Sequence, residues 1–192
     1  MLARILGPQK LLLGLTGAAA LLTVGLVGAA GSSSAAPAAA GGAALAADAT
    51  SYDPVPSAIR VPPGNRLVAR LDAQGVQVYQ CTAGAWGFLE PVAALSDRSP
   101  ADATIHFRGP SWESIRDGSL VEATTIASSP VVGSIPQLLL QATRTRGDGI
   151  FGSVTYVQRL NTTGGVIPTT ACTDGQTRGV PYTAEYRFYV KA

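Results

Sequence analysis

The sequence predicts an all-β fold, a single-domain antiparallel β-sandwich or a partly closed β-barrel. About seven or eight short segments have the composition or the period-two alternation of strands. Glycine and proline, which interrupt strands and form turns, occur 22 and 13 times in 192 residues. No segment beyond the N-terminal region has the spacing of an amphipathic helix. Together these observations indicate a sheet domain with many tight turns.

The N-terminal region has the organisation of a signal peptide. Arg4 and Lys10 precede an uncharged run over residues 11–30, and an Ala-rich segment with Ala44-Leu45-Ala46 follows. This pattern predicts a secreted or extracytoplasmic protein of the cell envelope, with no membrane span after cleavage. The run at 11–30 is long enough to cross a bilayer, so an uncleaved N-terminal anchor is the alternative.

The chain is predicted to contain one folded domain after this region. Residues 1–46 form the signal peptide and Ala-rich processing region, residues 47–57 a flexible leader, and residues 58–192 the β domain. Arg4 and Lys10 account for the whole excess of 14 basic over 12 acidic side chains, so the mature chain is formally neutral. A nucleic-acid partner, which would need a basic surface, is therefore not expected. The sequence leaves the oligomeric state open.

The first half of the domain contains short strand patterns separated by turns. They occur at residues 67–71, 76–81, 86–92 and 104–108. A turn at 72–75 is predicted to join the first two into a hairpin. A second hairpin is predicted over residues 112–126, because Asp117-Gly118 is typical of a two-residue turn between strands.

The second half has longer patterns. Residues 135–143 form a continuous apolar run that predicts a buried strand, with one helical turn as the alternative. Residues 154–160 alternate and predict a strand that ends at Gly164-Gly165. Its first face comprises Val154, Tyr156, Gln158 and Leu160. The clearest alternation predicts a half-buried antiparallel strand over residues 182–191. Its inner face comprises Tyr182, Ala184, Tyr186, Phe188 and Val190.

The two cysteines, Cys81 and Cys172, predict a disulfide in an exported chain. Two buried thiols acting as small apolar groups are the alternative. A metal site would need further ligands that the single histidine, His106, cannot complete, so no metal is expected. Residues 147–152 match the glycine spacing of a dinucleotide site, but a strand pattern follows where that site requires a helix. We interpret them as a hairpin loop and expect no cofactor.

The candidate catalytic residues are His106, Glu113 and Asp117. Strand alternation places His106 with Thr104 on the more polar face, where it could titrate near neutral pH or act as a hydrogen-bonded sheet residue. A two-residue turn at Asp117 would place Glu113 directly opposite Glu122, which is unfavourable unless arginine neutralises the pair or it shares a proton or cation. A solvated pair or a shifted register is the structural alternative.

The candidate binding residues are Trp112, Arg159 and Asn161. Trp112 belongs to a set of strand aromatics that could stack on a sugar, although such residues more often form the core. Arg159 and Asn161 are predicted to share a strand face, where they could contact a ligand or support the following glycine turn.

Five groups of residues carry a family resemblance. They are Tyr79-Gln80-Cys81; Gly109-Pro110-Ser111-Trp112-Glu113 with Asp117-Gly118-Ser119; Ile135-Pro136 with Leu138-Leu139-Leu140; Gln158-Arg159-Leu160-Asn161-Thr162 with Gly164-Gly165-Val166 and Pro168; and Tyr182-Thr183-Ala184-Glu185-Tyr186 with Phe188-Tyr189. In order and spacing they resemble the secreted domain-of-unknown-function family 3455. Gln137 departs from the family pattern, which usually has tryptophan there. The resemblance implies an exported, compact β-rich domain, and it implies no established activity, substrate or catalytic residue.

These observations lead to three functional hypotheses. The first is a binding module for a cell-envelope glycan or a small ligand, with polar loops near residues 106–119 forming the site. The second is a secreted hydrolase that uses His106 with Glu113, Asp117 or Glu122. The third is a structural envelope protein without a ligand. No nucleophile on a recognisable catalytic turn is present, so the sequence favours binding over catalysis.

Overall fold

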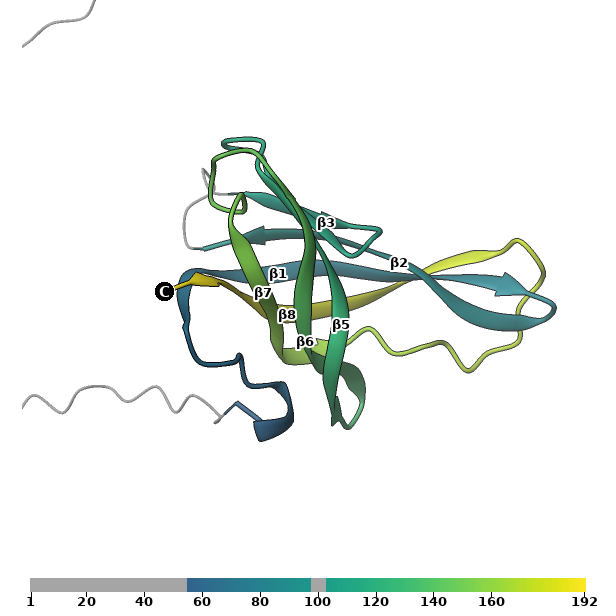
Figure 1. The fold of residues 1–192 in the computed structure, drawn as a ribbon. Coiled ribbons are helices and arrows are strands. Elements are labelled where there is room, and N and C mark those ends of the chain that lie inside the picture. Colours follow the sequence, from purple (N-terminus) through teal and green to yellow (C-terminus); the bar gives the residue numbers. More distant parts are fainter. Residues whose placement is uncertain (1–54, 98–102) are drawn as a thin grey trace, which may run out of the picture. The chain divides into compact units, whose positions relative to one another are not determined.

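The computed structural model describes residues 55–97 and 103–192, so the predicted signal peptide and most of the predicted leader lie outside the described residues. Within these residues, eight antiparallel strands follow one another around a closed barrel (Figure 1). Each strand pairs with the next in sequence, and β1 pairs with β8 to complete the ring. The predicted all-β class is therefore confirmed, in its barrel form.

The elements have the following bounds: η1 Ser57–Ile59, β1 Asn65–Thr82, β2 Ala85–Ser96, β3 Thr104–Phe107, β4 Ser111–Ser114, β5 Leu120–Val131, β6 Ser134–Arg146, β7 Val154–Gly164 and β8 Thr177–Lys191. The described residues contain no helix long and apolar enough to cross a membrane.

The predicted turn at residues 72–75 is wrong, because β1 continues through it as one strand. Leu71 and Ala73 face the buried interior of the barrel. Glycine is typical of turns, but Gly75 has a packing role in this strand. A Cβ at this position would lie 2.2 Å from the carbonyl oxygen of Val92 in β2. Glycine inside a strand here marks a close approach of two backbones.

The predicted pairing of Glu113 with Glu122 is also wrong. The loop from Ile115 to Ser119 is longer than a two-residue turn, so Glu113 lies opposite Leu120 and Glu122 lies opposite Ser111. Two separate arginines bind the carboxylates: Arg146 at 2.5 Å from Glu113 and Arg144 at 2.6 Å from Glu122. The like-charge conflict is thus removed by the register and by these ion pairs.

The interior of the barrel is packed at one end. All five residues predicted for the inner face of β8 are buried, which confirms that face. Towards the end of this strand, Phe188 packs on Phe151 with ring centroids 4.6 Å apart, and Val154 and Val190 belong to the same cluster. Tyr186 lies earlier in β8 than Phe188, towards the other end of the barrel, where the cavity described below begins.

A short N-terminal segment covers part of the outer surface. Ile59 is fully buried against Leu139 and Leu160, and its carbonyl accepts a 2.6 Å hydrogen bond from the Gln158 amide. Leu139 is buried outside the ring while Leu138 and Leu140 face inward, which explains the continuous apolar run in β6.

The predicted shared face of Val154, Tyr156, Gln158 and Leu160 is only partly correct. A bulge between Val154 and Tyr156 turns Val154 into the interior, while Tyr156 and Leu160 pack under Ile59 outside.

The predicted disulfide between Cys81 and Cys172 is present. It attaches the connection from β7 to β8 to an arm formed by residues 76–92 and 177–182, where β1, β2 and β8 extend beyond the rest of the barrel (Figure 1). Two further contacts hold this connection: Tyr79 donates to the Gly165 carbonyl at 2.6 Å, and the Trp86 indole donates to the Thr170 carbonyl at 2.9 Å.

Candidate functional site

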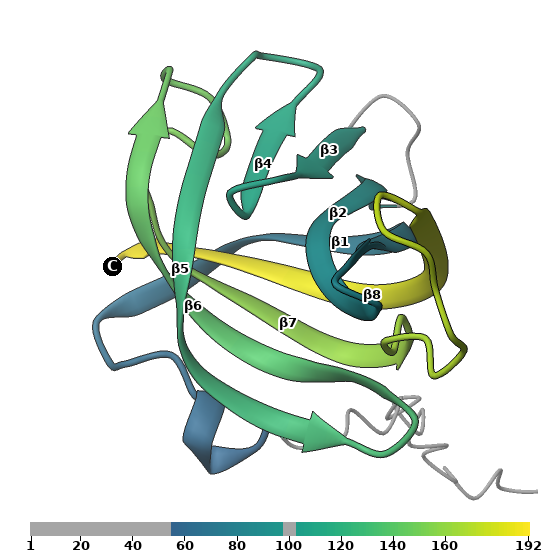
Figure 2. The ribbon, with the colours of Figure 1, turned by 90° about the vertical axis from the view of Figure 1, so that its right-hand side faces the viewer.

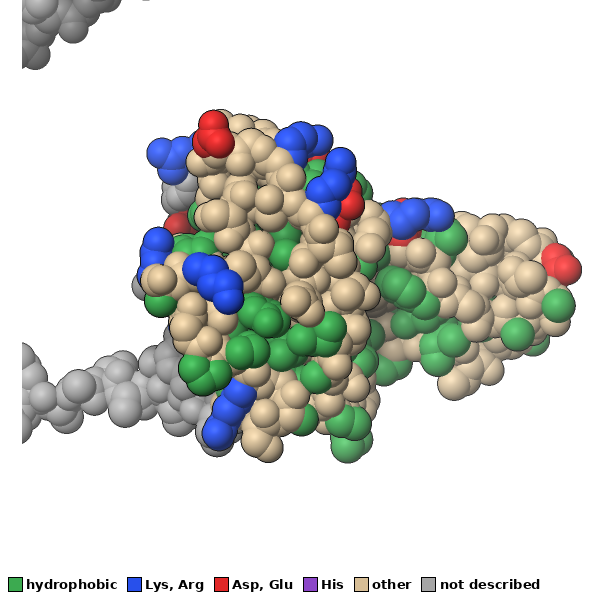
Figure 3. Space-filling view, viewed as in Figure 1, with side chains coloured by type: hydrophobic (Ala, Val, Ile, Leu, Met, Phe, Trp, Pro, Cys, Tyr) green, Lys and Arg blue, Asp and Glu red, His purple; other side chains and the backbone are tan. Residues whose placement is uncertain are grey.

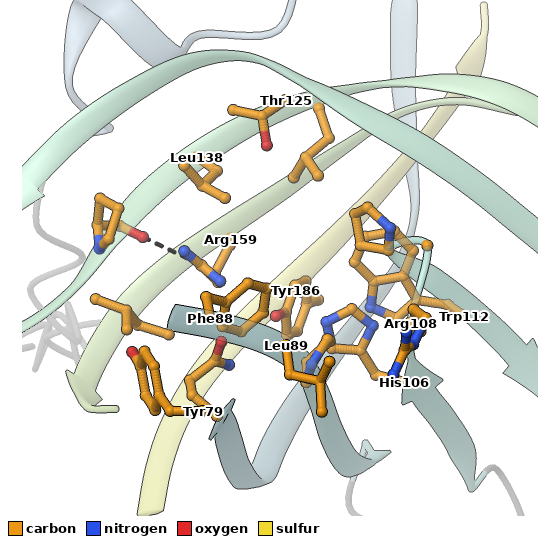
Figure 4. A pocket seen from close by; sticks show the side chains of 17 residues that line it. Tyr79, Phe88, Leu89, His106, Arg108, Trp112, Thr125, Leu138, Arg159 and Tyr186 are labelled. Carbon is orange, nitrogen blue, oxygen red and sulfur yellow. Dashed lines mark hydrogen bonds between the residues drawn. The ribbon is translucent and has the colours of Figure 1, made fainter. Parts of the chain in front are cut away.

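A cavity of about 570 Å³ occupies the end of the barrel next to the arm. All eight strands contribute side chains to it, and Figure 4 shows them converging from around the ring. The principal lining residues are Gln77 and Tyr79 from β1, Phe88 and Pro91 from β2, His106 from β3, Trp112 from β4, Thr125 from β5, Leu138 and Leu140 from β6, Arg159 from β7 and Tyr186 from β8.

The short strands β3 and β4 leave this cavity open to one side. β2 pairs with β3 only over Ala93–Leu95, and β5 pairs with β4 only over Leu120–Glu122. The remaining parts of β2 and β5 therefore face each other with no strand between them (Figure 2). The surface is hollowed between the barrel body and the arm, and hydrophobic side chains gather there (Figure 3).

His106 and Trp112 form one wall of the cavity. Their rings are stacked with centroids 4.4 Å apart and an angle of 3° between the planes. The His106 Nδ1 lies 2.8 Å from the Ser111 carbonyl, which can only accept, so Nδ1 carries the hydrogen. The pKa of His106 is lowered from 6.5 to about 3, mainly by burial and to a smaller extent by the Arg159 charge, while the hydrogen bond to Ser111 acts in the opposite direction. The side chain is therefore neutral near pH 7. His106 does share a face with Thr104 as predicted, but that face is buried inside the barrel.

Several buried polar atoms around the cavity lack a partner among the described residues. The Trp112 indole nitrogen and the Tyr186 hydroxyl are two of them, and the Gln77 amide nitrogen and the Tyr182 hydroxyl are the others. Tyr182 is close to both Tyr186 and Gln77, and Tyr186 is also close to Arg159, and these side-chain contacts affect the pKa values of the two tyrosines, but none of them reaches full hydrogen-bond geometry. Burial raises the pKa of both tyrosines, so they remain neutral donors. Buried groups of this kind are rare in folded proteins.

Arg159 supplies a positive charge to the cavity. Its Nε donates to the Pro136 carbonyl at 3.1 Å, and its charge acts on Tyr79, His106 and Tyr186. No carboxylate of the described residues forms an ion pair with it. Arg108, the other arginine that lines the cavity, does have a carboxylate partner, because it is bound to Glu90 at 3.1 Å. Among the residues that the structure describes, no aspartate or glutamate lines the cavity.

The structure brings together three of the six predicted site residues, His106, Trp112 and Arg159, and places the other three elsewhere. Glu113 pairs with Arg146 away from the cavity. Asp117 stabilises a loop by accepting hydrogen bonds from the backbone N–H groups of Ser119 and Ile150 at 2.9 and 3.2 Å. The pKa of Asp117 is lowered to about 2, and the largest cause is the side chain of Ser119, followed by its backbone N–H.

Asn161 does not share the inward face of Arg159. A register shift lies between Leu160 and Thr163, and Asn161 has a positive φ of 50°. Its amide donates instead to the Glu185 carboxylate at 3.3 Å, and Glu185 is buried beneath Arg70 and Arg187. The predicted shared face is therefore wrong, because the bulge turns the strand between the two residues.

Sequence reasoning missed Gln77 as a site residue. It occupies an inward position of β1, in phase with Leu71, Ala73 and Tyr79, and it is only 2% exposed. A polar amide in an otherwise apolar inward series was the available signal. The predicted turn at residues 72–75 concealed it, because the turn divided that series into two strands.

The described residues contain no group of three or more histidine, cysteine, aspartate or glutamate side chains placed to hold a metal ion. No curated protein and no solved structure matches this chain. A family of proteins of unknown function, DUF3455, matches over residues 62–190, which include all eight strands apart from the last residue of β8, Lys191. The match agrees with the resemblance carried by the five residue groups. The chain belongs to the DUF3455 family of proteins of unknown function.

Proposed function

We propose that this protein is an exported binding module that holds a small, largely apolar molecule in the barrel cavity. The observation that carries the proposal is the preformed cavity, whose wall includes Trp112 and Tyr186, two side chains that each have a buried polar atom without a hydrogen-bond partner among the described residues. An unsatisfied buried polar group costs about 1–3 kcal/mol. A ligand that accepts these hydrogen bonds would recover that free energy.

The lining favours a small apolar ligand over a glycan. Phe88, Leu138 and Leu140 give the cavity a mainly hydrophobic wall, whereas a sugar would need a dense set of hydrogen-bonding groups. Cavities of roughly 300–1,000 Å³ are the usual size for sites of small molecules. The disulfide supports export, because such bonds persist in oxidising compartments.

The placement of the titratable groups gives less support to a hydrolase. His106 is the only titratable group in the cavity whose charge could change below pH 7, and its Nδ1 is held by the Ser111 carbonyl. Glu113 and Asp117, the proposed acid or base partners, are bound to other residues outside the cavity. The lowered pKa makes the Nε2 of His106 a weak base, and no carboxylate of the described residues lines the cavity to assist it.

A neutral fluorescent probe tests the proposal. N-phenyl-1-naphthylamine becomes brighter in apolar surroundings, and we expect a saturable rise in emission with the wild-type protein. Leu138→Trp fills the cavity and should weaken binding by about 10-fold or more, since the probe loses most of its buried contact area. Val132→Trp, at a fully exposed turn position, is the matched control and should bind like the wild type.

Circular dichroism and thermal unfolding would establish that both variants fold. Two results would overturn the proposal: no saturable rise in probe emission with the folded wild type, or equal probe affinity in the folded Leu138→Trp variant and the wild type.

A further inference from the structure

We propose that the cavity selects amphipathic carboxylates, with the carboxylate bound at Arg159 and the apolar body packed against β2 and β6. This inference rests on the proposed function, because it specifies the ligand class of the same cavity.

The first argument is the hydrogen-bonding character of the unpartnered groups. The Trp112 indole and the Gln77 amide nitrogen can only donate, and Arg159 has N–H groups beyond the one bound to Pro136. The Tyr186 hydroxyl, whose pKa is raised by burial, is also a donor. All four side chains line the same cavity, and the groups described here are donors, so an acceptor-rich ligand fits this cavity better than a donor-rich one.

The second argument is charge. Arg159 is half-buried and has no carboxylate partner among the described residues, while Arg108, Arg144 and Arg146 all have one. A guanidinium removed from water without a counter-ion is unfavourable. An anion in the cavity would compensate this charge, and a neutral apolar ligand would not.

The third argument is geometry. The bond from Arg159 Nε to the Pro136 carbonyl holds the guanidinium group in place. Figure 4 shows Arg159 next to Phe88 and Tyr186, and its charge acts on the Tyr186 hydroxyl. A planar guanidinium with two free N–H groups matches the two oxygens of a carboxylate. Leu138, Leu140 and Pro91 provide the apolar wall for the rest of the molecule.

Decanoate and decan-1-ol test the inference, because they share an alkyl chain and differ in the charge of the head group. Each would displace N-phenyl-1-naphthylamine from the wild-type protein at neutral pH. We expect decanoate to compete at a concentration about 10-fold lower or less, because hydrogen bonds to charged groups are stronger than neutral ones. This comparison uses the unmodified protein, so it does not depend on the folding of any variant.

Arg159→Met keeps the unbranched stem and removes the charge. It should abolish the preference for decanoate over decan-1-ol. Arg144→Met, which removes an arginine that is bound to Glu122 and does not line the cavity, is the matched control and should keep the preference.

Equal competition by the two probes in the wild type would overturn the inference while the proposed function stands. The same conclusion follows if folded Arg159→Met retains the preference. Failure of the neutral fluorophore to bind at all would overturn the proposed function and this inference with it.

Discussion

His106 should make the stability of this domain fall in mildly acidic solution. The side chain is 3% exposed and stacked on Trp112, and burial is the main reason that its pKa falls from 6.5 to about 3. Between these two values the unfolded chain binds a proton at this residue and the folded chain does not. Acidification in that range therefore favours unfolding. Well above pH 6.5 the side chain is neutral in both states, and His106 then causes no loss of stability.

The expected magnitude follows from this difference in proton binding. Each pH unit within the range corresponds to about 1.4 kcal/mol, so His106 should cost the fold on the order of 2–3 kcal/mol between about pH 7.5 and pH 4.5. Asp117 does not interfere, because its pKa is lowered from 3.8 to about 2 and its stabilising contribution is lost only below that range. A loss of this size is a large share of the stability of a single domain.

His106→Asn is the matched variant, since the Asn amide can donate to the Ser111 carbonyl in place of Nδ1 but does not titrate. Urea unfolding, followed by tryptophan fluorescence and circular dichroism at several pH values, gives the free energy of unfolding of both proteins. We expect the variant to be less stable near pH 7 but to show a smaller dependence on pH. Parallel pH profiles for the two proteins would refute the reasoning.

Two further predictions concern covalent and packing constraints. Replacing Cys81 and Cys172 together with alanine should lower the free energy of unfolding by up to about 4.6 kcal/mol, from the chain-entropy relation for residues 91 apart. Urea unfolding measures this, and free thiols detected in the oxidised wild type would contradict the premise. Gly75→Ala should cost about 2 kcal/mol, because its Cβ would overlap the Val92 carbonyl. Gly87→Ala, whose nearest neighbouring atom is 3.8 Å away, should change the melting temperature little, and equal losses in the two variants would count against the packing argument.

Much of the barrel could be predicted from local sequence because its strands are amphipathic. In β8, Tyr182 to Val190 alternate as the barrel requires, and one side of the strand is buried. The prediction failed where a residue had two possible roles. Gly75 has the chemistry of a turn but occupies a close strand contact, and Asp117-Gly118 belongs to a loop longer than the two-residue turn it suggests.

The cavity was harder to predict because it depends on contacts between strands far apart in the sequence. His106, Trp112 and Arg159 were each recognisable as candidates, but no local pattern indicates that they meet. Glu113 was an equally reasonable candidate from its residue type alone. The register of β4 against β5 and the bulges in β7 decide which of these side chains face inward.

The disulfide also has a consequence for the rate of folding. β1 is the first strand of the sequence and β8 is the last, and the two strands pair over most of their length. The contact that closes the ring therefore joins residues far apart in the sequence. Contacts of this kind slow folding, because the chain must lose entropy before they form. Cys81 lies at this seam, where its N–H donates to the Gln176 carbonyl at 2.8 Å. An oxidised chain therefore begins folding with the two ends of its slowest pairing already joined, whereas a reduced chain must bring them together by diffusion.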